Sequence, residues 1–273
     1  MPVSLGTTRW GAVLILAAAA TLACQGQTRG TLPSQVLGET REFIVHLPQS
    51  YSGAAERRYP VVYVLDGTSQ DGHTARSAAL MARSGVMPEV IVVGLPNVRG
   101  GRPRDYTPPF IRQDTEDANS PMGRADKFLA FLKTELIPHI EGQYRTAPFR
   151  MLAGHSRGGL FVGYSLLADP LLFQARFAHS PTFHREDTLM AKKFSEFLPT
   201  LRAPDLFFYM SVGTKENQAL TAAFEAVRRV FSEQARQNLR WQADLTPDAE
   251  HANNGELATP VGFRVLYRNR PAH

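Results

Sequence analysis

The chain has 273 residues, of which 43% are apolar and 20% charged, and its formal net charge is +5. This is an ordinary globular composition, and the length allows one large domain or at most two small ones. The arginines are scattered and form no dense basic run, so the sequence does not indicate a nucleic-acid-binding protein.

Residues 1–23 have the pattern of a secretory signal peptide. Arg9 precedes an apolar stretch from Trp10 to Ala20, and small residues lead from there to Cys24. The stretch is shorter than the roughly 20 residues that a membrane-spanning helix requires. We therefore expect the chain to be exported, either to the periplasm or to a membrane surface.

Cys24 is the only cysteine, so no disulfide can form within the chain. Its place at the expected cleavage site resembles the lipobox of bacterial lipoproteins, in which the thiol receives lipid and anchors the protein to a membrane. Thr21 departs from that pattern, which usually has leucine there, and a plain signal peptide cut near Cys24 is the alternative. The polar residues 24–35 are expected to form a tether, and residues 36–270 the folded domain.

Strand and helix patterns follow the tether. Residues 39–47 alternate in polarity as a strand does, whereas residues 59–65 and 90–95 are almost continuously apolar. Uninterrupted apolar runs of this length are typical of strands buried on both faces of a parallel sheet. A helix is predicted between these two runs, over residues 74–84.

The longest irregular stretch covers residues 96–122 and is rich in arginine and proline. A loop of this length in a compact domain is either functional or disordered. A helix is predicted after it, over residues 124–137, because Phe128, Leu132 and Leu136 fall on one helical face.

The run Gly154-His155-Ser156-Arg157-Gly158 is the most informative motif of the chain. A Gly-x-Ser-x-Gly run between a short buried strand (residues 150–153) and a helix (residues 159–167) is typical of the nucleophile elbow of a serine hydrolase. The tight turn needs glycine on both sides, and the strained backbone at Ser156 holds its hydroxyl clear of the sheet.

The remaining pattern alternates regularly between strands and helices. Strands are predicted over residues 206–212 and 239–245, and helices over residues 220–237 and 255–267. This alternation favours a single α/β domain in which helices flank a mostly parallel central sheet. The fold predicted is that of an α/β hydrolase, with no insertion long enough for a large lid domain.

A serine nucleophile needs a histidine base, and in an α/β hydrolase the chain order is serine, acid, histidine. His251 follows the last predicted strand, which is where the base should be. His179 and His184 come too early in the chain for this role. The acid should follow the strand over residues 206–212, and Glu216 is the first choice there. The carboxylates adjacent to the base remain open as alternatives: Asp248 and Glu250.

Two backbone N–H groups are needed to bind the oxyanion of the reaction. One should be that of Arg157, directly after the nucleophile. The second should come from the turn after the strand over residues 59–65, where the sequence favours Gly67 or Thr68 without deciding between them.

Several motifs in register between residues 36 and 268 carry a resemblance to a known family. They are Tyr59–Gly67 (YPVVYVLDG), Val90–Leu95 (VIVVGL), Arg104–Pro108 (RDYTP), Glu135–Glu141 (ELIPHIE), Ala153–Gly159 (AGHSRGG), His179–Pro181 (HSP), Val212–Glu216 (VGTKE) and Glu250-His251. With them the chain resembles the Putative esterase family of α/β hydrolases, which includes esterase D, the enterochelin (siderophore) esterases and the related mycolyltransferases.

The resemblance implies that Ser156 is the nucleophile and His251 the base. The family's acid is less uniform, because some siderophore-esterase relatives work with a serine–histidine pair. The segment Arg104-Asp105-Tyr106 is similar to one near the active site of the siderophore-hydrolase branch. We therefore expect this segment, together with His155, to contact the substrate.

The sequence thus predicts a serine carboxylic ester hydrolase that acts through an acyl-enzyme on small esters, without a cofactor or metal ion. In a sharper form of this prediction the substrate is a siderophore trilactone, and Arg99, Arg102 or Arg104 attracts its anionic ferric complex. Two alternatives stay open: an acyltransferase that uses the same residues, and a catalytically silent envelope binding protein. The oligomeric state is left open.

Overall fold

The computed structural model describes residues 27–203, 205–235 and 237–268. The expected signal peptide and Cys24 lie outside these ranges, so export and lipidation remain predictions. Within the described ranges, no helix has the length and apolar character needed to cross a membrane.

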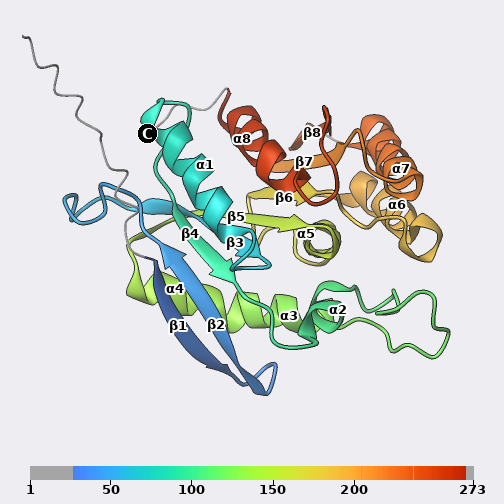
Figure 1. The fold of residues 1–273 in the computed structure, drawn as a ribbon, viewed down its shortest axis with the longest axis horizontal. Coiled ribbons are helices and arrows are strands. Elements are labelled where there is room, and N and C mark those ends of the chain that lie inside the picture. The colour runs from blue at the N-terminus through green and yellow to red at the C-terminus, as the bar shows by residue number, and fades with distance from the viewer. Residues whose placement is uncertain (1–26, 204, 236, 269–273) are drawn as a thin grey trace, which may run out of the picture.

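An eight-stranded sheet runs through the molecule in the order β1-β2-β4-β3-β5-β6-β7-β8 (Figure 1). The strands from β4 to β8 are mutually parallel, whereas β2 pairs antiparallel with both β1 and β4. Their bounds are β1 Thr28–Ser34, β2 Glu39–His46, β3 Tyr59–Leu65, β4 Ile91–Leu95, β5 Thr146–His155, β6 Ala175–His179, β7 Leu206–Gly213 and β8 Leu239–Thr246. The predicted α/β-hydrolase fold, with its mostly parallel sheet, is confirmed.

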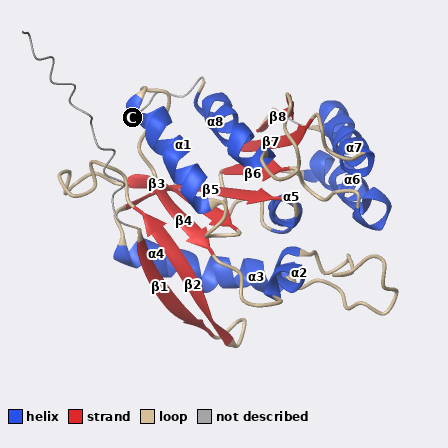
Figure 2. Ribbon diagram, in the orientation of Figure 1, coloured by secondary structure: helices blue, strands red, loops and turns tan. Residues whose placement is uncertain are grey.

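Helices cover both faces of this sheet (Figure 2). Helices α1 and α8 pack against each other over one face, and the others that contribute to the core lie on the opposite face with the larger apolar cluster. The helices are α1 Asp71–Arg83, α2 Gly101–Tyr106, α3 Ala125–Phe131, α4 Ile137–Gln143, α5 Arg157–Ala168, α6 Arg185–Phe197, α7 Gln218–Gln234 and α8 Asn254–Tyr267. Two further turns are π-helical (η1, Leu132–Leu136) and 3₁₀-helical (η2, Leu198–Thr200).

Strand β3 shows why its sequence is almost continuously apolar. Val62 and Val64 pack into the cluster under α1 and α8, whereas Val61, Tyr63 and Leu65 pack into the cluster on the other face. Both faces of a central parallel strand are covered by helices, which favours apolar side chains at successive positions. The predicted strands over residues 59–65, 90–95 and 206–212 are all confirmed within one residue at each end.

The expected tether is wrong for most of its length. Residues Thr28–Ser34 form the edge strand β1, which pairs with β2 along its whole length. The turn that follows is held by Glu135 of η1, which accepts hydrogen bonds from the Ser34 hydroxyl and from the backbone N–H groups of Gln35 and Val36. The folded domain therefore begins before residue 36.

Besides β1, further elements of the structure were not expected from the sequence. Strand β6 and helix α6 follow the elbow helix α5, and the short helix α2 lies within the stretch that was expected to be irregular. The helix predicted over residues 124–137 is longer than expected, because α3, η1 and α4 run on continuously to Gln143.

Candidate active site

Ser156 stands in a sharp turn between β5 and α5. Its backbone has φ 59° and ψ −116°, a strained combination for a residue other than glycine. Gly154 is required here, because a Cβ at that position would lie 2.5 Å from the carbonyl oxygen of Gly158. The Ser156 N–H donates to the carbonyl of His179 at 2.9 Å, which fixes the turn against β6. The geometry is that of a nucleophile elbow.

Three loops at the carboxyl ends of parallel strands bring Ser156, His251 and Glu216 together. His251 Nε2 lies 2.9 Å from the Ser156 hydroxyl, and His251 Nδ1 lies 2.7 Å from Glu216 Oε2. A carboxylate can only accept, so Nδ1 carries the proton and the neutral ring leaves Nε2 free to accept from the serine hydroxyl. The side chains that the sequence singled out therefore form one continuous hydrogen-bonded chain.

The side chain of Glu216 is fully buried, with 0% exposure. Its Oε1 accepts hydrogen bonds from the Ser180 hydroxyl at 2.6 Å and the Gly213 N–H at 2.7 Å. Burial alone would raise the pKa of Glu216, but the hydrogen bonds from His251, Ser180 and Gly213 outweigh it, and the pKa lies below its usual value. Glu216 is therefore a carboxylate at neutral pH.

Ser180 and Asn254 support this carboxylate, and neither was expected to have a role in the site. Asn254 is buried and donates from Nδ2 to the Ser180 hydroxyl at 2.9 Å, which in turn points its proton at Glu216. The available signal was the segment His179–Pro181, which follows β6 at the same edge of the sheet as Ser156. Because β6 itself was not predicted, that segment could not be placed beside the acid.

The expected second oxyanion donor is wrong for both candidates. The Gly67 N–H donates to the Leu95 carbonyl at 2.9 Å, and the Thr68 N–H donates to Asp71 Oδ1 at 2.6 Å. Glycine is needed at position 67 because a Cβ would lie 2.5 Å from the backbone nitrogen of Leu95, so its close approach is to β4 rather than to a ligand. The Arg157 N–H differs, since it opens α5 and has no acceptor within the helix.

A family model described as "Putative esterase" matches residues 34–256, a span that contains Ser156, Glu216 and His251. The chain belongs to the Putative esterase family. This confirms the resemblance carried by the sequence motifs.

Two curated relatives are similar to part of the chain. It is 31% identical over 176 residues to the ferri-bacillibactin esterase BesA of Bacillus subtilis, a match that covers 59% of this chain and 60% of that protein. It is 28% identical over 163 residues to the apo-salmochelin esterase of Escherichia coli, covering 56% of this chain and 51% of that one. The matched part thus spans less than two thirds of either relative.

Among solved structures, the chain is similar to an IroE-like serine hydrolase from Shewanella oneidensis. The TM-score is 0.77 at 28% identity, and the match covers 89% of this chain and 80% of that one.

In this Putative esterase family member, His155 lies behind the base. Its Nε2 is 2.6 Å from the backbone carbonyl of His251, and the two rings lie 4.7 Å apart. A carbonyl only accepts, so Nε2 must be protonated. Burial, and then the charge of His251, lower the pKa of His155 to about 4. His155 therefore holds the loop of the base through its contact with the His251 carbonyl.

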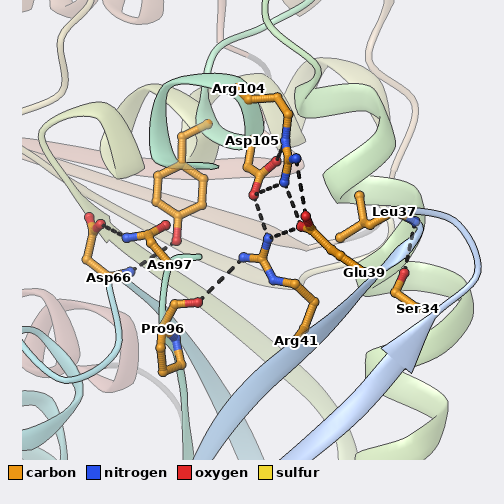
Figure 3. Close-up of polar contacts among 10 residues, drawn as sticks. Ser34, Leu37, Glu39, Arg41, Asp66, Pro96, Asn97, Arg104 and Asp105 are labelled. Carbon is orange, nitrogen blue, oxygen red and sulfur yellow. Dashed lines mark hydrogen bonds and ion pairs between the residues drawn. The ribbon is translucent and has the colours of Figure 1, made fainter. Parts of the chain in front are cut away.

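The segment Arg104-Asp105-Tyr106 was expected to contact the substrate, and the structure places two of its side chains in the interior. Asp105 and Tyr106 are 1% and 0% exposed. Asp105 pairs with the buried Arg41 at 2.6 Å, and Arg104 bridges Asp105 and Glu39 (Figure 3). This network ties α2 to β2 and gives the segment a structural role.

Tyr106 and Arg102 instead act on the turn at Asp66, which precedes Gly67. The Tyr106 hydroxyl accepts a hydrogen bond from the Asp66 N–H at 3.2 Å. The carboxylate of Asp66 in turn accepts from the side-chain amide of Asn97 (Figure 3). The Arg102 guanidinium donates to both carboxylate oxygens of Asp66, at 2.6 and 2.9 Å. It also donates to the His155 carbonyl at 3.3 Å. The turn after β3 and the nucleophile strand β5 are thereby joined through one guanidinium.

Within the described ranges, no group of three or more His, Cys, Asp or Glu side chains is arranged to hold a metal ion. The chemistry that the site can perform therefore has to be argued from the serine, the imidazole and the carboxylate themselves.

Proposed function

We propose that this protein is a serine carboxylic ester hydrolase that works through an acyl-enzyme. The observation that carries the proposal is the hydrogen-bonded chain from Glu216 through His251 to Ser156, with contacts of 2.7 and 2.9 Å. A hydroxyl is a weak nucleophile until a neighbouring base accepts its proton, and an imidazole needs a carboxylate to hold it in the productive tautomer. Membership in the Putative esterase family supports the same chemistry.

In the first half of the reaction, His251 Nε2 takes the hydroxyl proton while Ser156 Oγ forms a bond to the ester carbonyl carbon. The electron pair of the carbonyl moves to its oxygen, and the Arg157 N–H donates to the resulting oxyanion. When this tetrahedral species collapses, the bond to the alcohol oxygen breaks. The alcohol leaves with the proton from His251, and the acyl group stays on Ser156.

In the second half, water takes the place of the alcohol. His251 removes a proton from the water as its oxygen attacks the acyl carbon, and the Ser156 oxygen then leaves with that proton. The acid product departs and the free hydroxyl is restored. Glu216 stays ionised throughout and stabilises the imidazolium formed in each half.

Active-site labelling and substitution test this proposal. We expect the mature protein to hydrolyse short-chain 4-nitrophenyl esters and an organophosphonate to label Ser156. Ser156→Ala and His251→Ala should each lower kcat by about 10⁴-fold or more. The proposal fails if the protein hydrolyses no ester of the panel and Ser156 resists labelling. Adding alcohol acceptors to the same assay separates hydrolysis from acyl transfer by its products.

For the physiological substrate we propose a siderophore ester. The support is the pair of relatives named ferri-bacillibactin esterase and apo-salmochelin esterase, at 31% and 28% identity. We expect higher kcat/KM for the lactone bonds of a ferric or iron-free catecholate siderophore than for 4-nitrophenyl acetate. Equal or absent activity on the siderophores would overturn this substrate while leaving the ester hydrolase intact.

We also propose that the protein is exported, because residues 1–23 have the pattern of a signal peptide. Labelling of expressing cells with a palmitate analogue tests it. Label on the wild type that disappears in Cys24→Ala supports a lipid anchor, and a shortened, unlabelled chain supports a plain signal peptide. An uncleaved chain contradicts both.

A further inference from the structure

Two arginine side chains meet beside the nucleophile. Arg157 follows Ser156 directly, and its Nη1 donates to the Gln113 carbonyl and to the Thr107 hydroxyl, both at 2.8 Å. Arg185 donates from Nη2 to the same Gln113 carbonyl at 3.3 Å and from Nη1 to Thr115 Oγ1 at 3.3 Å. Two cationic groups therefore share one neutral oxygen as their common acceptor.

Arg185 belongs to the segment after β6 that packs against the nucleophile. Thr182 of this segment donates its N–H to the Ser156 carbonyl at 3.2 Å. The two guanidinium groups therefore come from two different segments that both touch the elbow. Both guanidinium groups contact the irregular stretch at Gln113.

Neither guanidinium forms an ion pair with a carboxylate in the part of the chain that the structure describes. The other arginines near the site do: Arg102 pairs with Asp66, Arg104 with Glu39 and Asp105, and Arg112 with Glu186. Partly buried charges in proteins are normally paired. Among these arginines of the described residues, Arg157 and Arg185 therefore stand out as guanidinium groups without a paired carboxylate.

Arg176 shows how this protein provides hydrogen-bond acceptors for a guanidinium group that has a purely structural role. It is fully buried and donates to Ser165 Oγ and to the backbone carbonyls of Ser165, Asp169, Pro170 and Phe173. Arg157 and Arg185 have two contacts each, which leaves most of their donors available. A guanidinium presents five N–H donors in a fork that matches a carboxylate.

The electrostatics of the pair agree with this geometry. Burial, and then repulsion from Arg185 and Arg102, lower the pKa of Arg157 to about 10. Burial also lowers the pKa of Arg185, opposed by Asp114, Glu186 and Glu116. Asp114 is exposed and its Oδ1 accepts from the Glu116 N–H, so its charge acts on the pair only from a distance. An anion bound between the two guanidiniums would relieve their repulsion.

We infer that Arg157 and Arg185 form an anion subsite, and that the preferred substrates of this enzyme are esters that carry a carboxylate or a similar oxyanion group close to the scissile bond. This inference rests on the proposed ester hydrolase. A bound anion would replace the Gln113 carbonyl as the shared acceptor, since a charged acceptor forms the stronger hydrogen bonds.

Matched pairs of esters test the subsite. On the acyl side the pair is mono-4-nitrophenyl adipate and its methyl ester, and on the alcohol side it is 3-acetoxybenzoate and its methyl ester. Within each pair the reacting ester is the same and only the negative charge differs. We expect at least one anionic member to have a kcat/KM about tenfold or more above its neutral partner, the usual effect of a hydrogen bond to a charged group.

Arg185→Gln separates this role from catalysis, because Arg185 has no part in the proposed reaction steps. We expect this variant to lose the preference for the anionic ester through a higher KM while it hydrolyses the neutral ester at the wild-type rate. Arg185→Lys should keep part of the preference. Arg228→Gln removes a charge from an exposed position on α7 that pairs with Glu225, and it should change neither ester.

The outcomes are distinct. The anion subsite is overturned if the neutral and anionic esters have equal kcat/KM, or if the preference survives both Arg185→Gln and Arg157→Gln. Either result leaves the proposed ester hydrolase intact. If the wild-type protein hydrolyses none of the esters, the proposed function itself is overturned.

Discussion

Glu216 accepts three hydrogen bonds, and only one of them comes from the base. The others, from Ser180 Oγ and the Gly213 N–H, orient the carboxylate before any substrate arrives. Asp248, the alternative acid from the sequence, has an 87% exposed side chain and pairs with Lys215 at 3.2 Å. Its exposure leaves it in water, where it can do little to hold the His251 tautomer. Burial and hydrogen bonding both favour Glu216 as the acid of a full triad over a serine–histidine pair.

Replacement of Glu216 by Gln tests the role of this acid. The amide cannot hold the imidazole as a carboxylate does, because its NH₂ group would face the Nδ1–H, and we expect kcat to fall by about 10³- to 10⁴-fold. Asp248→Asn is the matched control and should retain full activity. Steady-state kinetics on a short-chain 4-nitrophenyl ester measures both. A Glu216→Gln variant with near-wild-type kcat would mean that Ser156 and His251 work as a pair.

At the scale of single residues, the sequence predicted what chain order determines and missed what distant backbone contacts determine. The meeting of Ser156, Glu216 and His251 could be predicted because each follows a recognisable strand. Gly67 and Thr68 were misjudged because their N–H groups are used by Leu95 and Asp71, and no local pattern reveals an acceptor on another segment.

At the scale of elements, the strands that were predicted carry either a continuous apolar run or a regular alternation of polar and apolar residues. Strand β1 escaped prediction because it lies at the sheet edge with most side chains exposed, so its sequence lacks an apolar pattern. Strand β6 is fully buried, yet it carries Arg176 and His179, which interrupt its apolar run. Polar residues satisfied inside the fold disguise a buried strand in the same way that exposure disguises an edge strand.

The contact between β2 and α2 depends on a buried ion pair. Arg41 is 2% exposed and Asp105 1% exposed, and the nearest of their polar atoms lie 2.6 Å apart (Figure 3). Arg41 also donates to Glu39 and to the Pro96 carbonyl. Such a pair holds two elements in one register, but it leaves a costly buried charge if either partner is removed.

Asp105→Ala should therefore destabilise the protein by about 3–5 kcal/mol, the usual cost of breaking a buried pair. The double variant Arg41→Met with Asp105→Leu should recover most of this loss, since it removes both charges and keeps the volume. Denaturant unfolding measures each variant, and Asp248→Asn serves as an exposed control that keeps a residue suited to the positive φ of that position. A loss below about 1 kcal/mol for Asp105→Ala would show that the remaining charges compensate for it.

At the scale of the whole molecule, a buried polar layer separates the site from the core under α1 and α8. His179 is 3% exposed, and its ring nitrogens contact the hydroxyls of Ser211 at 3.0 Å and Thr259 at 3.3 Å. His155 and His73 lie close enough for their charges to act on it, and the three rings line one small cavity. Burial, followed by the charges of His155 and His73, lowers the pKa of His179 to about 3. The ring is therefore neutral in the folded protein across the physiological pH range.

This layer should make the fold sensitive to mild acid. An unfolded histidine titrates near 6.5, so below that pH the unfolded chain binds a proton that folded His179 does not. Stability is therefore fully present above pH 6.5 and is lost as the pH falls toward the folded pKa, by about 2 kcal/mol for this one residue at pH 5. Denaturant unfolding at pH 7 and pH 5 measures the loss, and His179→Gln should reduce it by that amount. If the His179→Gln variant loses as much stability between the two pH values as the wild type does, the acid sensitivity has another source, and the neutral layer beneath the triad does not set the lower pH limit of the fold.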